Sequence, residues 1–119
     1  MAEKAESKIR VFFIAKKDKE IFDFLKNNKK KIETRAATVR NSYAKTGDIA
    51  LFICDKKRLK KKIAKVTHYK TIDALLRKYR PSLINPSVSK VAELKEMYYS
   101  FPGYKEKIKK FGILALELL

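Results

Sequence analysis

The fold prediction starts from Lys29-Lys30-Lys31-Ile32-Glu33-Thr34-Arg35 and from Thr46-Gly47-Asp48-Ile49-Ala50-Leu51-Phe52. The first stretch places lysine, carboxylate and arginine side chains together on one short extended segment. In the second stretch, Gly47-Asp48 predicts a tight turn that leads directly into a buried strand. Fixed charges of both signs on a β-scaffold suit a polar ligand such as nucleic acid. The alternative is an ordinary solvated edge strand of a basic protein.

Size and charge narrow the class of protein. The chain has 119 residues, 45% of them hydrophobic, and a formal net charge of +17. This length corresponds to one domain that buries roughly two thirds of its unfolded surface. The hydrophobic content excludes a basic disordered tail. So strong a positive field attracts polyanions, of which nucleic acid is the commonest, while an anionic membrane surface or an acidic protein is the rival partner.

The remaining composition indicates an intracellular protein without metal or cofactor. Cys54 follows an apolar run and is expected to be a small buried hydrophobe, which fits a reducing compartment. His68 is the only histidine, so no metal site is predicted, and its role is expected to be structural. No apolar run approaches the ~18–20 residues of a membrane helix. We expect a flexible leader over 1–7, a single domain over 8–119, a cytoplasmic location and no membrane partner.

Hydrophobic patterning predicts an α+β domain. Strands are expected over 9–14, 30–37 and 49–54, then after a turn at 55–58 up to Tyr69, and over 111–118. The fourth strand breaks its period of two, which predicts a bulge around Ala64-Lys65. The last run is almost wholly apolar and is expected to be a central buried strand. Since the helices are inserted at two points without βαβ alternation, a small β-barrel of about five strands is predicted, whose closure removes exposed sheet edges.

The predicted helices are short and amphipathic. Their expected starts are the capping residues Asp18, Thr71 and Ser89, and a further basic helical turn is expected over 104–110. Their expected inward residues are Ile21, Phe24 and Leu25 in the first, Ile72, Leu75, Leu76 and Tyr79 in the second, and Val91, Leu94 and Tyr98 in the third. Pro81 ends the second helix, and 82–88, with its Asn85-Pro86 turn signal, is expected to be a loop.

The order of these signals resembles the ASCH domain (activating signal cointegrator homology) of the PUA-like superfamily. The residues that carry the resemblance are Lys30, Lys31, Ile32, Glu33 and Arg35; Gly47, Asp48 and Phe52; Tyr69, Leu75 and Leu76; Pro86, Glu93 and Tyr98; and Gly112, Ala115 and Glu117. The match covers roughly residues 9–118. The resemblance implies a PUA-like β-barrel with a cleft between the charged strand and the inserted helices. It also implies a role in RNA metabolism, as an RNA-binding module or an enzyme.

Some members of the family hydrolyse N4-acetylcytidine through a lysine, a threonine and a later acid. In this sequence the lysine falls on Lys30 and a neighbouring arginine on Arg35, whereas the threonine position holds Glu33. Thr34 is one residue away, and a regular strand would direct it to the opposite face. The later acid would fall within 81–88, which contains no carboxylate. Two of the three catalytic groups are therefore absent, and whether the protein is an enzyme stays open.

The candidate cleft is built on the second predicted strand. Glu33 and Arg35 share one face about 6.5–7 Å apart, so that the carboxylate can accept from a base amino group while the guanidinium donates to a carbonyl. The alternative is a weak ion pair on a hydrated face. Ideal alternation puts Lys30 on the other face unless the chain still turns there, so either Lys30 or Lys31 enters the cleft. Arg40 is a candidate contact from the loop that follows.

Further candidate RNA contacts lie outside this strand. Lys60, Lys61 and Lys62 are expected to form a ridge that binds phosphates, although a charge run is commonly only a solvated face. Tyr99 and Tyr104 are the candidate exposed rings for base stacking. If the protein is an enzyme instead, a ribonuclease or a modified-nucleoside amidohydrolase, Lys30 and Glu33 are the candidate acid–base pair. A third hypothesis is a module that docks an acidic protein.

Overall fold

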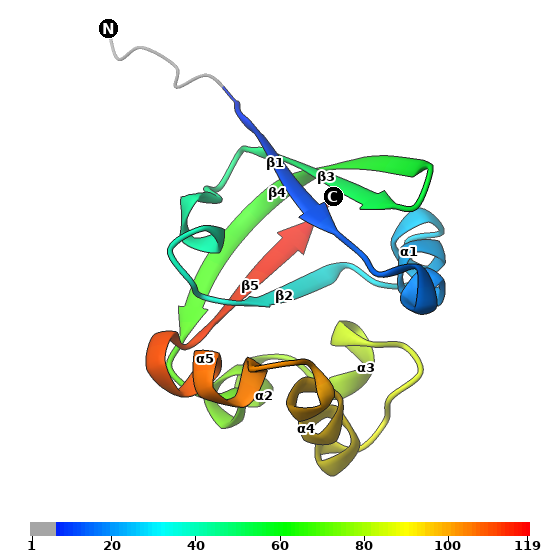
Figure 1. Ribbon diagram of the computed structural model, residues 1–119. Coiled ribbons are helices and arrows are strands. Elements are labelled where there is room, and N and C mark those ends of the chain that lie inside the picture. Colours follow the sequence, from blue (N-terminus) through cyan, green and yellow to red (C-terminus); the bar gives the residue numbers. More distant parts are fainter. Residues whose placement is uncertain (1–6) are drawn as a thin grey trace, which may run out of the picture.

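The elements follow the hydrophobic pattern closely along the described part of the chain, residues 7–119 of the computed structural model (Figure 1). The strands are β1 (Ile9–Phe13), β2 (Ile32–Ala36), β3 (Ile49–Cys54), β4 (Lys57–Tyr69) and β5 (Ile113–Leu118). The α-helices are α1 (Lys19–Lys26), α2 (Ile72–Lys78), α3 (Pro81–Ile84), α4 (Val91–Ser100) and α5 (Tyr104–Phe111), with 3₁₀ turns η1 (Lys16–Asp18) and η2 (Asn41–Tyr43). The predicted leader falls outside the described residues except for Ser7.

The strands form one five-stranded sheet in the order β1-β3-β4-β5-β2. β1 pairs with β3 in parallel, whereas β3–β4, β4–β5 and β5–β2 are antiparallel. The register of β4 against β5 shifts between Ile63 and Lys65, which confirms the predicted bulge. This bulge lets the thirteen residues of β4 pair with β3 at one end and β5 at the other.

β5 is the strand around which both hydrophobic cores assemble. Leu114, Leu116 and Leu118 pack into the core that α1 covers, whereas Ile113 and Ala115 pack into the core under α2, α3, α4 and α5. Because both faces of β5 are covered, its sequence is an unbroken apolar run instead of an alternating one. The prediction of a central buried strand is confirmed.

The predicted barrel is not closed, and this prediction was wrong. β1 and β2 are the two edges of an open, curved sheet. Closure would require β2 to pair with β1, but these two strands are not paired, and α3 and α5 pack against β2. β2 is also shorter than predicted, beginning at Ile32, so that Lys30 precedes the regular strand. The observed architecture is a mixed α+β fold in which α1 covers one face of the five-stranded sheet and α2, α3, α4 and α5 cover the other.

Several helix assignments also need correction. In α1 the most buried side chains are Phe22 and Leu25, while Phe24 is only partly buried. The second helix ends before Pro81, as predicted, but the first part of the predicted loop over 82–88 is helical: Pro81 begins α3, because proline is tolerated in the first turn of a helix. The capping position of α4 is Lys90 instead of Ser89, and Val91, which was predicted to point inward, is exposed. Thr71 caps α2 as predicted, accepting a hydrogen bond from the Ala74 N–H.

The predicted Gly47-Asp48 turn is confirmed and ties three segments together. Gly47 has a φ of 92°, which favours glycine. The buried Asp48 carboxylate accepts hydrogen bonds from the backbone N–H groups of Lys8 and Lys45 at 3.1 and 3.0 Å. It also accepts from Arg10 Nε at 2.9 Å. Asp48 therefore holds the start of β1 beside the start of β3.

The remaining composition-based predictions concern single residues and membrane helices. Cys54 is buried, as predicted. His68 Nε2 lies 2.7 Å from the Phe111 carbonyl oxygen, joining β4 to the end of α5, which fits a structural role. Within residues 7–119, no helix is long and apolar enough to cross a membrane.

The position of β5 between the two cores predicts the effect of shortening its side chains. Leu116→Ala should lower the free energy of unfolding by about 2–5 kcal/mol, since it opens a cavity at a fully buried position. Leu119→Ala removes the same atoms from a side chain that is 71% exposed and serves as the control. Urea denaturation followed by circular dichroism measures both. Equal losses in the two variants would contradict this account of the core.

Candidate functional site

A cleft of about 440 Å³ opens between the two edge strands of the sheet and the helices. Its walls come from the end of β1, from η1 and α1, from β2, and from the helical segments α3, α4 and α5. The side chains that give it chemical character are Phe13, Lys30, Glu33, Thr34, Arg35, Asn85, Tyr98 and Tyr104. The sequence stretch that predicted a charged strand thus lines this cleft.

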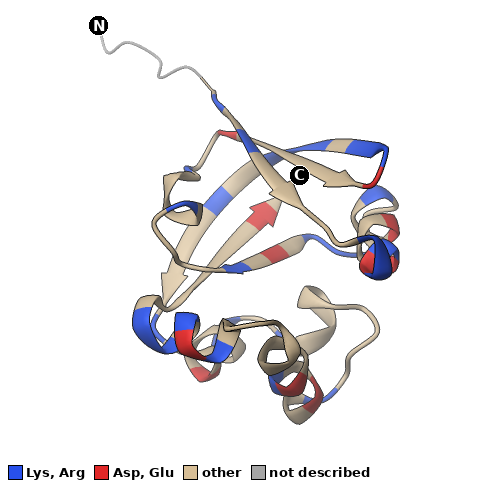
Figure 2. Cartoon of the chain, in the orientation of Figure 1, with Lys and Arg blue, Asp and Glu red and all other residues tan. Residues whose placement is uncertain are grey.

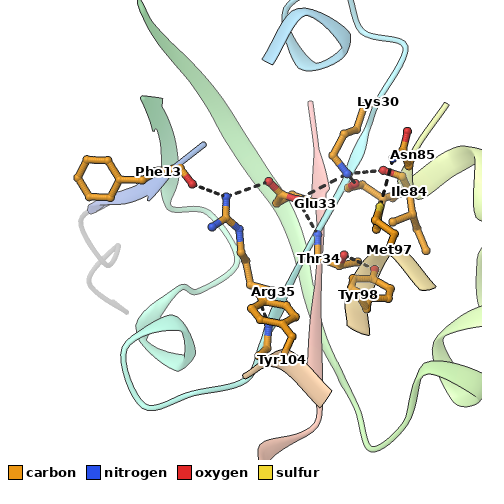
Figure 3. A network of polar contacts seen from close by, with 12 residues as sticks. Phe13, Lys30, Glu33, Thr34, Arg35, Ile84, Asn85, Met97, Tyr98 and Tyr104 are labelled. Atoms are coloured by element: carbon orange, nitrogen blue, oxygen red, sulfur yellow. Dashed lines mark hydrogen bonds and ion pairs between the residues drawn. The ribbon is translucent and has the colours of Figure 1, made fainter. Parts of the chain in front are cut away.

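Lys30 is the residue that joins the strand wall to the helical wall (Figure 3). Its ammonium donates to the carbonyl oxygen of Ile32 at 2.6 Å and to that of Ile84 at the end of α3. The same nitrogen lies 3.5 Å from Glu33 Oε1. The three protons of the ammonium therefore have three acceptors, two carbonyls and one carboxylate. Lys30 is almost fully buried as a consequence.

The structure also decides which of the two neighbouring lysines enters the cleft. Lys30 precedes the regular strand, where the chain still turns, and its side chain is 3% exposed. Lys31 is exposed and does not line the cleft. Strict alternation from Glu33 would have directed Lys30 to the other face, but alternation holds only within a regular strand.

Glu33 is a buried carboxylate, and not a member of a hydrated surface ion pair as the alternative reading of the strand had it. Its Oε1 accepts from the Thr34 N–H at 3.0 Å, and its Oε2 lies 3.4 Å from the Arg35 guanidinium. Burial acts to raise the pKa of Glu33. The charges of Lys30 and Arg35 outweigh burial and hold this pKa below its usual value. Glu33 is therefore an ionised acceptor within the cleft.

For Lys30, burial has a larger effect on the pKa than the neighbouring charges do. Burial lowers the pKa of its ammonium, and the neighbouring Glu33 carboxylate opposes that effect. Because both carbonyl acceptors and the carboxylate favour the charged form, Lys30 holds Glu33 in place as a cation. An engaged ammonium has no proton left for a ligand, so Lys30 is a positioning residue in this arrangement.

Arg35 bridges the two edges of the sheet. Its Nη2 donates to the Phe13 carbonyl oxygen at 3.1 Å and lies beside Glu33 Oε2. The guanidinium also stacks over the Phe12 ring, 5.4 Å from the ring centroid. Its side chain is 22% exposed. Since a guanidinium has five N–H donors, donors other than those on Nη2 can reach a ligand.

Three further polar groups line the cleft that were not predicted as site residues from the sequence. Asn85 is buried, and its Nδ2 donates to Met97 Sδ at 3.2 Å, a weak acceptor. Thr34 Oγ1 and the Tyr98 hydroxyl are hydrogen-bonded to each other. The only signal for Asn85 was the Asn85-Pro86 turn pattern, which marks a loop without showing that it returns to the cleft.

The two tyrosines predicted to stack on bases differ in position. Tyr104 lines the cleft, and its hydroxyl accepts from the Ala36 N–H at 3.3 Å, which leaves its own proton for donation. Tyr99 is 47% exposed on α4 and pairs with Lys105, whose ammonium lies 5.5 Å from the ring centroid. Tyr99 is not part of the cleft. Tyr98 is buried, as its place on the helical stripe predicted.

The other predicted cationic contacts lie outside the cleft, on the sheet and its loops (Figure 2). Lys60 and Lys62 are exposed on one face of β4, whereas Lys61 points to the opposite face and binds Asn28 Oδ1. The three lysines therefore do not form one ridge, because successive residues of a strand alternate. Arg40 is exposed beside η2, with its guanidinium 5.9 Å from the centroid of the Phe13 ring.

The arrangement is suited to recognition of a hydrogen-bonding ligand. One ionised acceptor, Glu33, shares the cleft with donors on Arg35 and Asn85, and the aromatic residues Phe101 and Tyr104 line the same cleft. Among residues 7–119 there is no group of three or more His, Cys, Asp or Glu side chains placed to hold a metal ion.

Solved structures similar to this chain include the following two. The crystal structure of hypothetical protein PH0355 matches with 27% identity and a TM-score of 0.76, over 93% of this chain and 96% of that chain. The solution NMR structure of protein PF0455 from Pyrococcus furiosus matches with 27% identity and a TM-score of 0.72, over 92% and 94%. No family model and no curated protein matches the sequence. The α+β fold is thus shared as one unit over nearly the whole of each chain.

The buried position of Lys30 predicts a large difference between two adjacent lysines. Lys30→Met should lower the free energy of unfolding by about 3–5 kcal/mol, because it leaves part of a buried charge network unpaired. Lys31→Met makes the same chemical change at an exposed position and should stay within about 0.5 kcal/mol of wild type. Chemical denaturation measures both. A Lys30→Met protein as stable as Lys31→Met would show that the network does not hold the fold.

The lowered pKa of Glu33 predicts sensitivity to acid. Its ionised form stabilises the fold above the unfolded value of about 4.3, and this contribution is lost as the pH falls through the lower folded pKa. Glu33→Gln should flatten the acid side of the stability profile between about pH 5 and the acid limit of folding. Glu96→Gln, at an exposed position of α4, is the matched control. If the free energy of unfolding falls with acid equally in wild type and in Glu33→Gln, the pKa of Glu33 is not lowered in the folded protein.

Proposed function

We propose that this protein is an RNA-binding module that holds one nucleotide base in the cleft. The observation that carries the proposal is the buried, ionised Glu33 carboxylate beside Arg35 in a cleft large enough for a base. A carboxylate accepts from N–H groups, and a guanidinium donates to carbonyl and ring nitrogen atoms of a base edge. A charge kept inside the protein at the cost of desolvation favours a specific hydrogen-bonding role.

The aromatic residues of the cleft support the same proposal. Phe101 and Tyr104 pack edge to face, with their ring centroids 5.3 Å apart, and both line the cleft. Bases of single-stranded RNA commonly stack on such rings while their edges are hydrogen-bonded. The Tyr104 hydroxyl adds a donor at the same wall. Stacking and edge recognition are therefore both available to one bound base.

The net charge supplies the affinity in this proposal. With a formal charge of +17, the protein attracts the phosphate backbone from a distance. Lys60 and Lys62 are exposed and carry no ion pair among the described residues. Phosphate contacts fix the position of a nucleic acid without reading its sequence. The cleft would then provide selectivity, and the basic surface most of the binding free energy.

The proposal includes assignment to the ASCH family within the PUA-like superfamily. The supporting observations are the order of the sequence signals and a cleft between the charged strand β2 and the inserted helices. The open sheet departs from the closed barrel that the resemblance implies. A cytoplasmic location and RNA as the partner are parts of the same proposal.

A second candidate function is hydrolysis of RNA or of a modified nucleoside. The observation that favours it is the desolvated Lys30 ammonium, 3.5 Å from the Glu33 carboxylate in a cleft that also contains Thr34. Incubation of RNA and N4-acetylcytidine with wild type and Glu33→Gln separates the two functions. Turnover by wild type that is lost in Glu33→Gln supports the enzyme, whereas no turnover by either leaves the binding module.

The two parts of the proposed site predict different mutational effects. Arg35→Ala should weaken binding of the preferred RNA by about 1–3 kcal/mol and other RNAs little, because base-edge contacts carry sequence information. Lys60→Glu with Lys62→Glu should weaken all RNAs alike. Fluorescence anisotropy with a panel of single-stranded oligonucleotides, repeated at several salt concentrations, measures both effects.

Measuring the RNA affinity at several salt concentrations can contradict this prediction. Log K should fall by about 0.7 per neutralised phosphate for each log unit of salt on single strands. An affinity that does not change between low and physiological salt would rule out phosphate binding. A uniform loss on every RNA for Arg35→Ala would show that the cleft does not recognise a base.

A further inference from the structure

One face of the β1-β3-β4 part of the sheet combines apolar and basic side chains in regular rows. Paired residues of neighbouring strands point to the same side, so the register assigns the members of each row. We call the following nine residues the outer face: Phe13, Ile53 and Arg58; Val11, Leu51 and Lys60; Ile9, Ile49 and Lys62. Each row runs from an apolar residue on edge strand β1 to a cation on β4.

The outer face is uncovered within the described part of the chain. Ile9, Val11 and Phe13 are 53%, 39% and 58% exposed. Their neighbours on β1 and β3 that point inward, such as Phe12 and Phe52, are buried in the core that α1 covers. A sheet with one face in the core is expected to carry polar residues on its other face. Two adjacent apolar strands on the solvent side therefore indicate a binding surface.

The cations of the outer face lie in one row along β4. Arg58, Lys60 and Lys62 are two residues apart along β4, which places successive side chains about 6.5–7 Å apart. A straight row of cations along a strand suits the phosphates of one nucleic-acid strand that lies along it. The apolar columns beside it suit the bases of that strand.

Phe13 connects the outer face to the cleft. Its backbone carbonyl accepts from Arg35 inside the charged network, while its ring points away from Glu33 (Figure 3). Phe13 also lines the cleft and forms the end of the first row of the outer face. The Arg40 guanidinium lies over the same ring. A strand with one base in the cleft would therefore pass over Phe13 directly onto the outer face.

We propose that single-stranded RNA runs from the cleft over Phe13 and across the outer face, with its phosphates along Arg58, Lys60 and Lys62. This inference rests on the proposed function and specifies its ligand as an extended single strand of several nucleotides. The outer face contacts the nucleotides next to the one recognised in the cleft. Lys61 takes no part, because its side chain points to the opposite face and binds Asn28.

Two other occupants of the outer face fit the structure less well. A second copy of the chain would bring together two proteins that each carry a charge of +17, and their repulsion opposes association. An acidic protein segment would match the cations but would not explain why the outer face continues into a cleft with a carboxylate. Single-stranded RNA accounts for both the cation row and the continuity at Phe13.

The experiment measures binding as a function of RNA length. Wild type, Lys60→Gln/Lys62→Gln and the control Lys107→Gln/Lys109→Gln are titrated with a labelled mononucleotide, a single-stranded RNA of eight nucleotides and the matching duplex. The control removes the same charge from exposed positions of α5. We expect the Lys60/Lys62 variant to reduce the salt slope of the octamer by about 1.4, that is about 0.7 for each lost phosphate contact. The mononucleotide should bind equally to all three proteins.

The apolar rows need a variant of their own. Val11→Glu changes an exposed residue in the middle row and introduces a charge that repels phosphate without disturbing the core. It should weaken the octamer at least tenfold and leave the mononucleotide unchanged. Circular dichroism and thermal unfolding confirm that the variant folds. An unchanged octamer affinity would remove the outer face from the RNA path.

The outcomes distinguish this inference from the proposed function. If the Lys60/Lys62 variant and the control change octamer binding equally, RNA does not run across the outer face, but the cleft remains the RNA site. Tighter binding of the duplex than of the single strand overturns the extended conformation. If poly-glutamate competes as effectively as RNA, the outer face binds an acidic protein segment instead. If the protein self-associates in sedimentation and Val11→Glu abolishes this association, the outer face binds a second copy of the chain. If neither mononucleotide nor octamer binds wild type, the proposed function itself fails.

Discussion

The cleft depends on one buried ammonium group. Lys30 donates to carbonyl oxygens of Ile32 and Ile84, which belong to the strand wall and the helical wall, and it lies beside the Glu33 carboxylate. A cation removed from water must find acceptors for its protons, and these three acceptors come together only when α3 lies against β2. The position of the helices relative to the sheet edge, and with it the width of the cleft, follows from this requirement.

The same network explains why the sheet stays open. Arg35 spans from Glu33 on β2 to the Phe13 carbonyl at the end of β1, so a side chain joins the two edges where backbone pairing would close a barrel. A side-chain bridge leaves space that a ladder of backbone hydrogen bonds would eliminate. The charges on β2 are therefore both part of the fold and part of the cleft that it encloses, which is why Glu33 stays ionised while buried.

Charge and burial are distributed differently over the two parts of the molecule. In the cleft a few charges are buried and compensated, so they act through directed hydrogen bonds. On the outer face the cations are hydrated and without ion pairs in the described residues, so they act mainly through the long-range field. Phe13 lies at the boundary between the two and contributes its carbonyl to one and its ring to the other.

The sequence alone determines the features of this protein that depend on residues close together in the chain. The apolar run of β5, the bulge in β4, the Gly47-Asp48 turn and the shared face of Glu33 and Arg35 were all predicted, because each follows from strand periodicity or turn chemistry. Only the tertiary structure decided between Lys30 and Lys31, left the barrel open and brought Asn85 into the cleft. These outcomes depend on contacts between segments far apart in the chain, such as the bond from Lys30 to Ile84, which no local period encodes.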